Sequence, residues 1–398
     1  MAEVTNYIDR LVAELCPNGV EYRPLGELLA YEQPTKYLVS SKDYDESYPT
    51  PVLTAGKTFI LGYTNETEGI YPASEEEPVI IFDDFTTAFK WVEFPFKAKS
   101  SAMKMLTLKS GTNSLFKYVY YAMQCIVYNS SDHARQWISK YSNIEIPVPP
   151  IEIQEAIVEI LDKFTNLEAE LEAELEARTL QYEYYRDSLL NSFSEPAVKF
   201  YPIEELFTTR NGYTPSKSNS SYWENGTVPW FRMEDIRENG GVLSEALQSV
   251  HESALKKGGM FPAGSIIVAT SATIGEHALI NVDFLCNQRF TVLTPKEEFK
   301  SLLLPKFLYY YSFVLDRWCL SNTTQSSFAS VDMKRFKKFE FPLPSLEEQQ
   351  RIVDILDRFD ALTSSLSEGL PAELAARRSQ YEYYRDQLLT FPRKGENQ

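Results

Sequence analysis

The sequence predicts an α/β (α+β) protein in which two globular mixed α/β domains are separated by two long antiparallel coiled-coil helices, with a pseudo-two-fold internal repeat. Three observations lead to this prediction. Several blocks of sequence occur twice, and each globular stretch is followed by a helical one with heptad-like apolar spacing. A chain of 398 residues is also too long for one ordinary core.

The internal repeat is clearest in the helical parts. The block IVEILDKF at 157–164 recurs as IVDILDRF at 352–359, and QYEYYRDSLL at 181–190 recurs as QYEYYRDQLL at 380–389. Upstream of these blocks, IPVP at 146–149 matches FPLP at 341–344. Repetition of such blocks by chance is negligible, so the chain contains one unit twice, each copy a globular part followed by a helix.

The repeats divide the chain into four segments. The first globular domain covers 1–149 and includes an N-terminal helix over 4–16, and a central spacer helix covers 150–194. The second globular domain covers 195–344, and a C-terminal spacer helix with a tail covers 345–398. Strand-like runs such as VIIF and GSIIVA lie between Gly, Asn and Pro turns, which indicates mixed α/β structure in both globular parts.

Both spacer segments have the pattern of long amphipathic helices. In the first, apolar residues recur from Ile157 to Leu189, and Leu-Glu-Ala-Glu repeats between 167 and 177 add strong helix formers. About 40 residues at 1.5 Å each give a rod of roughly 60 Å. The second helix should kink or break at 369–371, because proline removes a helix donor. Two matching stripes are most simply buried by antiparallel pairing.

The QYEYYRD blocks carry more aromatic and charged side chains than a coiled-coil seam uses. A coiled coil with no further role would explain the apolar stripe, but residues 182–187 cover every face of a helix. We therefore expect some of these side chains to contact a partner protein rather than solvent. The candidates for partner binding are Tyr182, Tyr184, Tyr185, Arg186, Tyr381, Tyr383, Tyr384 and Arg385.

Composition narrows the class of protein. The net charge of −17 looks wrong for a DNA binder, but much of the excess acid lies in the spacer helices, and 90–117 holds six lysines and one acid. No run of about 20 apolar residues is present, and the N-terminal segment does not have the pattern of a signal peptide. The four cysteines are scattered, which favours a reducing cytoplasm over a disulfide scaffold or zinc site.

The sequence contains no recognisable catalytic motif. The tripeptide 56–58 (GKT) lacks the first glycine of a phosphate loop, and the prolines at 149–150 are followed by isoleucine rather than an aromatic residue. Asp83 and Asp84 could form a metal pair, but a loop role is favoured because no nuclease partner residues follow them closely. We therefore expect a non-catalytic chain that binds no cofactor and no metal itself.

The layout resembles the DNA specificity (S) subunit of type I restriction–modification systems over essentially the whole chain. The resemblance rests on the repeated PxP–helix–QYEYYRD blocks and on the lead-in IDRLVAELCPNG at 8–19. The second globular part matches best, with GYTPSK at 212–217, PWFRMEDI at 229–236, SATIG at 271–275 and NQRF at 287–290. The first part is a divergent version, with PVLT at 51–54, FDDFTT at 82–87 and SSAMK where the second has NQRF.

The resemblance implies a division of labour. Each globular part would be a target recognition domain that reads one half of a split site in double-stranded DNA. The helices would fix the spacing and bind two methyltransferase (M) subunits, which would hold S-adenosylmethionine, and restriction/translocase (R) subunits would join them. Independently, two lobes on one face of a duplex must enter major grooves about 34 Å apart, and a rod of roughly 60 Å can set such a separation.

Candidate DNA contacts follow from side-chain chemistry. Asn287, Gln288 and Arg289 bring together amide and guanidinium groups that suit base edges in the major groove, although any one of them could equally bond the domain's own backbone. The other candidates in the second domain are Lys217, Arg232, Lys256, Lys257, Ser271, Thr273 and Gln325. In the first domain they are Thr86, Thr87, Lys90, Lys99, Ser100, Ser101, Lys104, Arg135 and Gln136.

An alternative remains open at this stage. The charge of −17 also suits a protein-only scaffold or adaptor whose two lobes bind other proteins. Such a scaffold would show no DNA binding, whereas phosphate contacts make affinity fall steeply with salt.

Overall fold

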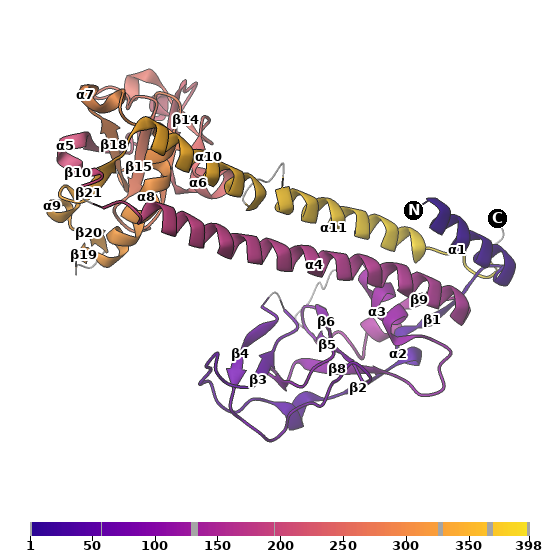
Figure 1. The fold of residues 1–398 in the computed structure, drawn as a ribbon. Helices are drawn as coiled ribbons and strands as arrows, with labels where there is room; N and C mark the ends of the chain where they lie inside the picture. Colours follow the sequence, from indigo (N-terminus) through magenta and orange to yellow (C-terminus); the bar gives the residue numbers. More distant parts are fainter. Residues whose placement is uncertain are drawn as a thin grey trace. The chain divides into compact units, whose positions relative to one another are not determined.

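The computed structural model describes residues 2–56, 58–128, 134–194, 196–324, 329–363 and 369–395. The chain divides into two compact units, each containing one globular domain and two helix segments (Figure 1). The first unit comprises Met1–Leu171 with Leu374–Gln398, and the second comprises Glu172–Glu373. The division between the units crosses both spacer helices, so each unit holds parts of both.

The domain of the first unit contains two sheets. The larger has the order β2 (Leu29–Glu32), β8 (Met103–Leu108), β5 (Val79–Asp83), β6 (Phe89–Val92), and all neighbours are antiparallel. The smaller has the order β4 (Ile60–Thr64), β3 (Thr50–Leu53), β7 (Lys97–Ala98), with β3 and β7 parallel. Helix α3 (Phe116–Gln124) and the strand pair β1 (Glu21–Pro24) and β9 (Glu145–Val148) complete the domain, and α1 (Ala2–Leu15) precedes it.

The domain of the second unit repeats this topology. Its larger sheet has the order β11 (Phe207–Asn211), β18 (Phe290–Pro295), β15 (Ser265–Ala269), β16 (His277–Ile280), with the short β13 (Val242–Leu243) added at the edge. Its smaller sheet is β14 (Ser249–Val250), β12 (Val228–Phe231), β17 (Leu285–Cys286), and β12 and β17 are again parallel. Helix α8 (Pro305–Ser321), helix α6 (Met233–Asn239) and the pair β10 (Lys199–Pro202) and β21 (Glu340–Leu343) complete it. The predicted internal repeat is confirmed.

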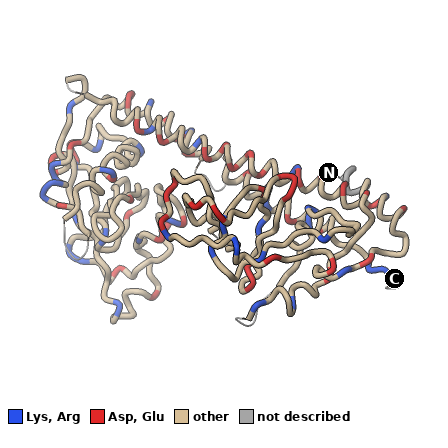
Figure 2. The backbone as a smooth tube through the Cα atoms, turned by 90° about the horizontal axis from the view of Figure 1, so that it is seen from below, with Lys and Arg blue, Asp and Glu red and all other residues tan. Residues whose placement is uncertain are grey.

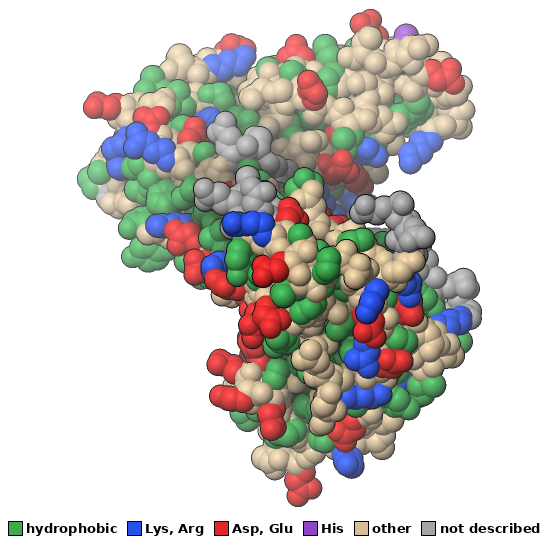
Figure 3. Space-filling model, turned by 90° about the vertical axis from the view of Figure 1, so that its right-hand side faces the viewer, with side chains coloured by type: hydrophobic (Ala, Val, Ile, Leu, Met, Phe, Trp, Pro, Cys, Tyr) green, Lys and Arg blue, Asp and Glu red, His purple; other side chains and the backbone are tan. Residues whose placement is uncertain are grey.

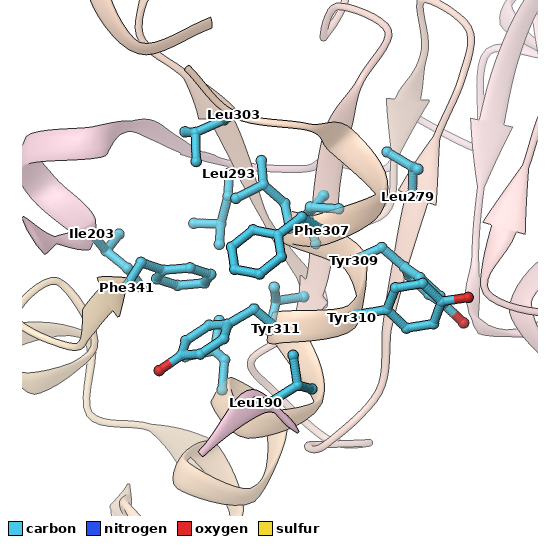
Figure 4. Packing of buried hydrophobic residues seen from close by; sticks show 14 of the residues in the cluster. Leu190, Ile203, Leu279, Leu293, Leu303, Phe307, Tyr309, Tyr310, Tyr311 and Phe341 are labelled. Carbon is cyan, nitrogen blue, oxygen red and sulfur yellow. The ribbon is translucent and has the colours of Figure 1, made fainter. Parts of the chain in front are cut away.

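The central strands explain where the cores lie. β15 (SIIVA) is buried along its whole length and β5 (VIIFD) at all but its last residue, which is the pattern of strands covered on both faces. In the second unit, α8 covers one face of the sheet with an aromatic row. Figure 4 shows Phe307 and Tyr311 of this row meeting Phe341 of β21 and Leu293 of β18. Burial of several such rings dominates the energetics of the core.

The predicted first spacer helix is confirmed as α4 (Ile151–Leu190), one helix of 40 residues, and acidic residues are spread along it (Figure 2). Its apolar stripe is buried mainly at its ends. Ile153, Ile157 and Leu161 lie in the core of the first unit, and Tyr182 and Leu190 lie in the core of the second. Between them the stripe is thinly covered, and Leu167 is 37% exposed. The ends of α4 are thus parts of the domain cores as well as of a helix pair.

The second spacer consists of α10 (Leu346–Thr363) and α11 (Gly369–Leu388). The expected interruption is confirmed, because α11 begins at Gly369 with φ +76° and Pro371 lies in its first turn, where proline is tolerated. In the first unit α11 runs antiparallel to α4, since Tyr384 stacks on Phe164 while Arg378 pairs with Glu168 at 2.6 Å. In the second unit α10 packs beside the other end of α4.

The end of α11 and the segment after it complete the first unit. Leu388, Leu389 and Phe391 join its core. The backbone of Val20 donates to Pro392 and accepts from Lys394, at 2.8 and 3.0 Å. Segments near the two ends of the chain therefore form one folded body.

Candidate nucleic-acid interface and helix joint

A cavity of about 690 Å³ in the second unit collects five of the predicted DNA-contact residues. Four separate segments line it, contributing Thr214, Lys217, Ser220, Trp223 and Glu224, then Trp230, Arg232 and Glu234, then Gln248, and then Asn287, Gln288 and Arg289. The five predicted residues are Lys217, Arg232, Asn287, Gln288 and Arg289. The sequence motifs of this domain thus converge in space.

The wall of the cavity is held by two tryptophans. The indole N–H of Trp230 donates to the carbonyl of Tyr213 at 3.1 Å, and that of Trp223 donates to the carbonyl of Ser216 at 3.1 Å. The two rings meet edge to face with centroids 5.0 Å apart. These contacts tie the loop that carries Lys217 to β12, so the loop is positioned by the rigid sheet.

The turn at 287–289 is fixed by its backbone. Gly212 donates to Phe290 at 3.0 Å and Thr270 donates to Arg289 at 3.0 Å. A Cβ at position 212 would lie 2.2 Å from the carbonyl oxygen of Asn287, so only glycine permits this approach. The turn therefore holds its three side chains in place at the cavity.

Hydrogen bonds orient the side chains of this turn. The Asn287 Oδ1 atom accepts from the backbone N–H of Arg289 at 2.9 Å, and the Thr214 hydroxyl donates to the Gln288 Oε1 atom. Within the described residues, the charged groups of Lys217 and Arg289 have neither an ion-pair nor a hydrogen-bond partner. Two cations and two amide NH₂ groups are thus presented at one cavity.

Arg232 is the most constrained of the five. Its guanidinium lies 5.6 Å from the ring centroid of Trp230, and its Nε atom lies 3.9 Å from Glu234 and 4.0 Å from Asp235. Among the residues that the structure describes, that Nε is buried without a hydrogen-bond partner. Asp235 also accepts the backbone N–H of Arg232 at 2.7 Å, which caps α6. Arg232 therefore shapes the wall of the cavity as well as contributing charge.

The other candidates of the second domain do not line this cavity. Lys256 lies over the ring of Tyr213 at 4.1 Å, and Lys257 is exposed beside it. Ser271 forms a bridge with Ser330, and the hydroxyl of Thr273 is buried with no hydrogen-bond partner in the described part of the chain. Gln325 lies outside the described residues.

The first unit places an equivalent turn at 100–102. Met103 donates to the carbonyl of Ser100 as Phe290 does to that of Asn287, and the Ser100 hydroxyl accepts from Ala102 at 3.1 Å, as the Asn287 side chain does from Arg289. Ser101 belongs to the same turn. The loop between β5 and β6 carries Thr86 and Thr87, Thr87 with φ +59°, and Lys90 and Arg135 are exposed. The ammonium of Lys99 donates to Tyr44 at 2.8 Å.

Two predicted DNA contacts of the first domain are contradicted. The side chains of Lys104 and Gln136 are fully buried. The ammonium of Lys104 lies 3.1 Å from the carboxylate of Asp84, outside hydrogen-bond geometry, and 4.9 Å from the ring centroid of Tyr31. Gln136 bonds the Tyr128 hydroxyl at 2.7 Å. Counting lysines along 90–117 could not separate inward-facing from outward-facing positions.

The same contacts attach the helices to the domains in both units, and we call this set the helix joint. The hydroxyl of Tyr121 donates to Asp162, as that of Tyr310 does to Asp357. Gln154 accepts the N–H of Leu115 and donates to Pro149, and Gln349 makes the matching bonds to Leu304 and Pro344. Phe164 stacks on Tyr384 at 5.7 Å, and Phe359 stacks on Tyr185 at 5.5 Å. Sequence reasoning missed the carboxylate, tyrosine and glutamine members, although the carboxylates and glutamines lie in or next to the repeated blocks.

Several predicted partner contacts serve this joint. Tyr182 is only 6% exposed, and burial is the main cause that raises its pKa to about 12, so its assignment to a partner surface is wrong. Tyr381 is half-buried and donates to Gln124, and Arg186 and Arg385 lie against the rings of Tyr182 and Tyr381. Tyr184 and Tyr383 are the most exposed of the set, at 71% and 59%, and Tyr185 is 42% exposed although its ring stacks on Phe359.

Comparison with known proteins decides the family. The sequence model described as the type I restriction modification DNA specificity domain matches residues 17–177 and 197–376. The chain belongs to this family. Each of the two matches begins just before a globular domain and extends into the helix that follows it, so the specificity chain carries the family domain twice.

Relatives match the specificity chain over nearly its whole length. The Escherichia coli EcoR124I/EcoR124II type I restriction enzyme specificity subunit is 48% identical over 99% of this chain and 98% of its own. A putative subunit from Haemophilus influenzae is 28% identical over 94% of this chain and 96% of its own. The crystal structure of an S subunit from M. genitalium shares the fold, with TM-score 0.52 and 14% identity, over 93% of this chain and 96% of that chain. A structure from work on complex assembly and conformational transition of the type I R-M system gives 0.57 and 16%, over 94% and 98%.

Three further features concern metal binding, membrane spans and surface charge. Across the described ranges, His, Cys, Asp and Glu do not gather in groups of three that could hold a metal ion. In that same part of the chain, no helix combines the length and apolar character needed to cross a membrane. The face in Figure 3 carries Lys and Arg interspersed with Asp and Glu, so positive charge is local there and not gathered in one patch.

Proposed function

We propose that this specificity subunit reads a two-part sequence in double-stranded DNA, one half-site per globular domain, and holds two methyltransferase (M) subunits through its helix blocks. It thereby directs adenine methylation and, with R subunits, restriction. The observation that carries the proposal is that the helix joint is the same in both units while the turns at 100–102 and 287–289 differ. Identical partners require that the two helix blocks be held on their domains in the same way, and different half-sites require different turns.

The cavity of the second unit supports the DNA part of the proposal. Lys217 and Arg289 supply free positive charge, and Asn287 and Gln288 supply hydrogen-bonding groups at one surface. Phosphate contacts position such a surface and base contacts give it sequence preference. Tyr184 and Tyr383, which occupy equivalent outward positions on the two helices, supply matching surfaces for two copies of a partner.

In this proposal the chain is non-catalytic, S-adenosylmethionine is held by the M subunits, and the complex works in the cytoplasm. Incubating the purified chain alone with S-adenosylmethionine and DNA should therefore give no methyl transfer. Adding the M subunits should restore it.

The central test is a gel shift of the reconstituted subunit–methyltransferase complex on random and selected duplexes. A two-part asymmetric site should emerge, and exchanging residues 196–345 for another recognition domain should change one half only. Affinity that is independent of sequence would refute the proposal. Absence of any DNA binding, at all salt concentrations, would favour the protein-only scaffold suggested by the net charge of −17.

A further inference from the structure

The turn at 287–289 presents hydrogen-bond donors to the cavity. The Asn287 Oδ1 atom is engaged by the Arg289 backbone N–H, which can only donate, so the Nδ2 group of Asn287 is the one left to face outward. Because the Thr214 hydroxyl donates to Gln288 Oε1, the amide NH₂ of Gln288 is likewise left for a ligand. Arg289 carries donors only.

A row of donors selects among base edges. In the major groove, guanine offers two acceptors, N7 and O6, whereas adenine offers one acceptor beside a donor, and cytosine offers a donor. Both amide oxygens of the turn are already engaged, so the two-way bonding that amides make to adenine is disfavoured here. The arrangement therefore matches the edge of guanine.

Carboxylates on the same cavity suit the other half of the pair. Glu224 and Glu234 are exposed and line the cavity with the donors. Carboxylates accept from the N4 amino group of cytosine, and they repel phosphate. Donors and acceptors on one surface thus fit a G·C base pair better than they fit the DNA backbone.

We propose that the second domain reads a G·C base pair through Asn287, Gln288 and Arg289, with Thr214 as the positioning residue that fixes the polarity of Gln288. This inference rests on the proposed function. It implies that the half-site read by the second domain contains an obligatory guanine, while the equivalent turn Ser100–Ala102 of the first domain has no long donors and reads its half-site by other contacts.

The test uses the complex with M subunits and a duplex carrying its mapped methylation site. Each guanine of the site is replaced in turn by 7-deazaguanine, which lacks only the N7 acceptor. One replacement in the half-site of the second domain should weaken binding by about tenfold or more. Three variants are compared, Asn287→Asp, Gln288→Glu and the control Asn281→Asp, an exposed residue outside the cavity that undergoes the same amide-to-carboxylate change.

The first two variants keep the structural hydrogen bonds, because a carboxylate oxygen can still accept from Arg289 or Thr214. They should weaken binding to the unmodified duplex by about tenfold or more. In at least one of them, the variant that removes the donor to N7, the 7-deaza replacement should then cost nothing further. Asn281→Asp should keep the full 7-deaza effect, and no variant should alter sensitivity in the other half-site. Thr214→Val should broaden the base preference at that position without changing the salt dependence of binding.

A two-part site whose second half lacks guanine, or a 7-deaza effect that persists in both Asn287→Asp and Gln288→Glu, would overturn the inference and leave the proposed function standing. Failure to find any two-part site would refute the proposed function as well.

Discussion

The two units differ at the base of the turns at 100–102 and 287–289, although the central strand pairs, β5 with β8 and β15 with β18, have the same register. Strand pairing makes Lys104 equivalent to Thr291, and Asp84 equivalent to Thr270. The first unit therefore has a buried ion pair with atoms 3.1 Å apart where the second has a buried hydroxyl–hydroxyl bond of 2.9 Å. The turn is therefore fastened to the sheet by an ion pair in the first unit and by a hydrogen bond between two hydroxyls in the second.

The helix joints show the opposite behaviour. Tyr121 with Asp162 and Tyr310 with Asp357 are the same pair twice, down to the donor and acceptor. The difference teaches that this duplicated chain has kept its side chains where the helices meet the domains and exchanged the buried side chains beneath the turns at 100–102 and 287–289. Four predictions would break or sharpen this comparison.

The largest effect is expected for Lys104→Met. Removing the ammonium leaves the carboxylate of Asp84 buried with no opposite charge, so the first unit should lose about 3–5 kcal/mol of unfolding free energy. Hydrogen exchange should rise across β5 and β8 and not across β15 and β18. Lys90→Met, which removes an exposed lysine nearby, should change stability by less than about 0.5 kcal/mol. Equal loss in both units would contradict the assignment.

Gln154→Met and Gln349→Met should be matched in effect. Each substitution removes a side chain near the start of a spacer helix. That side chain accepts from a backbone N–H, of Leu115 or Leu304, and donates to a backbone carbonyl, of Pro149 or Pro344. Leaving these groups unpaired should cost about 2 kcal/mol in the unit concerned, measured by denaturant unfolding followed by exchange. Costs that differ several-fold between the two variants would show that the joints are alike in geometry but not in energy.

Tyr182→Phe tests the joint through pH. Burial raises the pKa of Tyr182 to about 12, from an ordinary value of 10.0, so the folded state favours the neutral phenol. The stability from this group is fully present below pH 10 and is lost as pH rises toward 12. Between pH 10 and pH 12 the unfolding free energy of the variant should fall less steeply with pH than that of the unaltered protein. The difference in slope should be at most that of one proton, about 1.4 kcal/mol per pH unit. An unchanged pH dependence would refute the burial of this side chain.

The smallest effect on folding is expected at Tyr184 and Tyr383. Their rings are 71% and 59% exposed, so Tyr184→Ser and Tyr383→Ser should shift stability by less than about 0.5 kcal/mol. Each should nonetheless weaken binding of one M subunit, and the double variant should weaken both, as titration of M subunits would detect. Unaltered binding in the double variant would remove these residues from the proposed docking surface.

Much of the architecture could be predicted from sequence because its signal is periodic and repeated. The length of α4 and the start of a new helix at Gly369 follow from helical spacing and from proline, and the duplicated topology follows from the repeated blocks. The convergence of Lys217 and Arg289 at one cavity was not visible in any single motif, although each motif was recognised. The residues within the motifs that face inward were harder to identify.

The failures have a common physical origin. Lys104 and Tyr182 are polar or amphipathic side chains that the fold buries because a partner elsewhere in the sequence accepts them, Asp84 for the lysine and the core around α8 and α10 for the tyrosine. Composition and charge counts do not show which residues elsewhere in the sequence will contact such a side chain. The lysine is placed by strand register and the tyrosine by helix packing, and neither is a local property of the chain.

The backbone bonds between Val20 and the segment at 392–394 have a consequence for biosynthesis. A ribosome delivers residues 172–373, which make up the second unit, before it delivers Leu374 and the residues that follow. The core of the first unit, which includes Ile157 and Leu161, therefore stays incomplete until Leu388 and Leu389 have been made, whereas the second unit can already fold. Synthesis that stalls before α11 is finished would leave that apolar helix face open to aggregation.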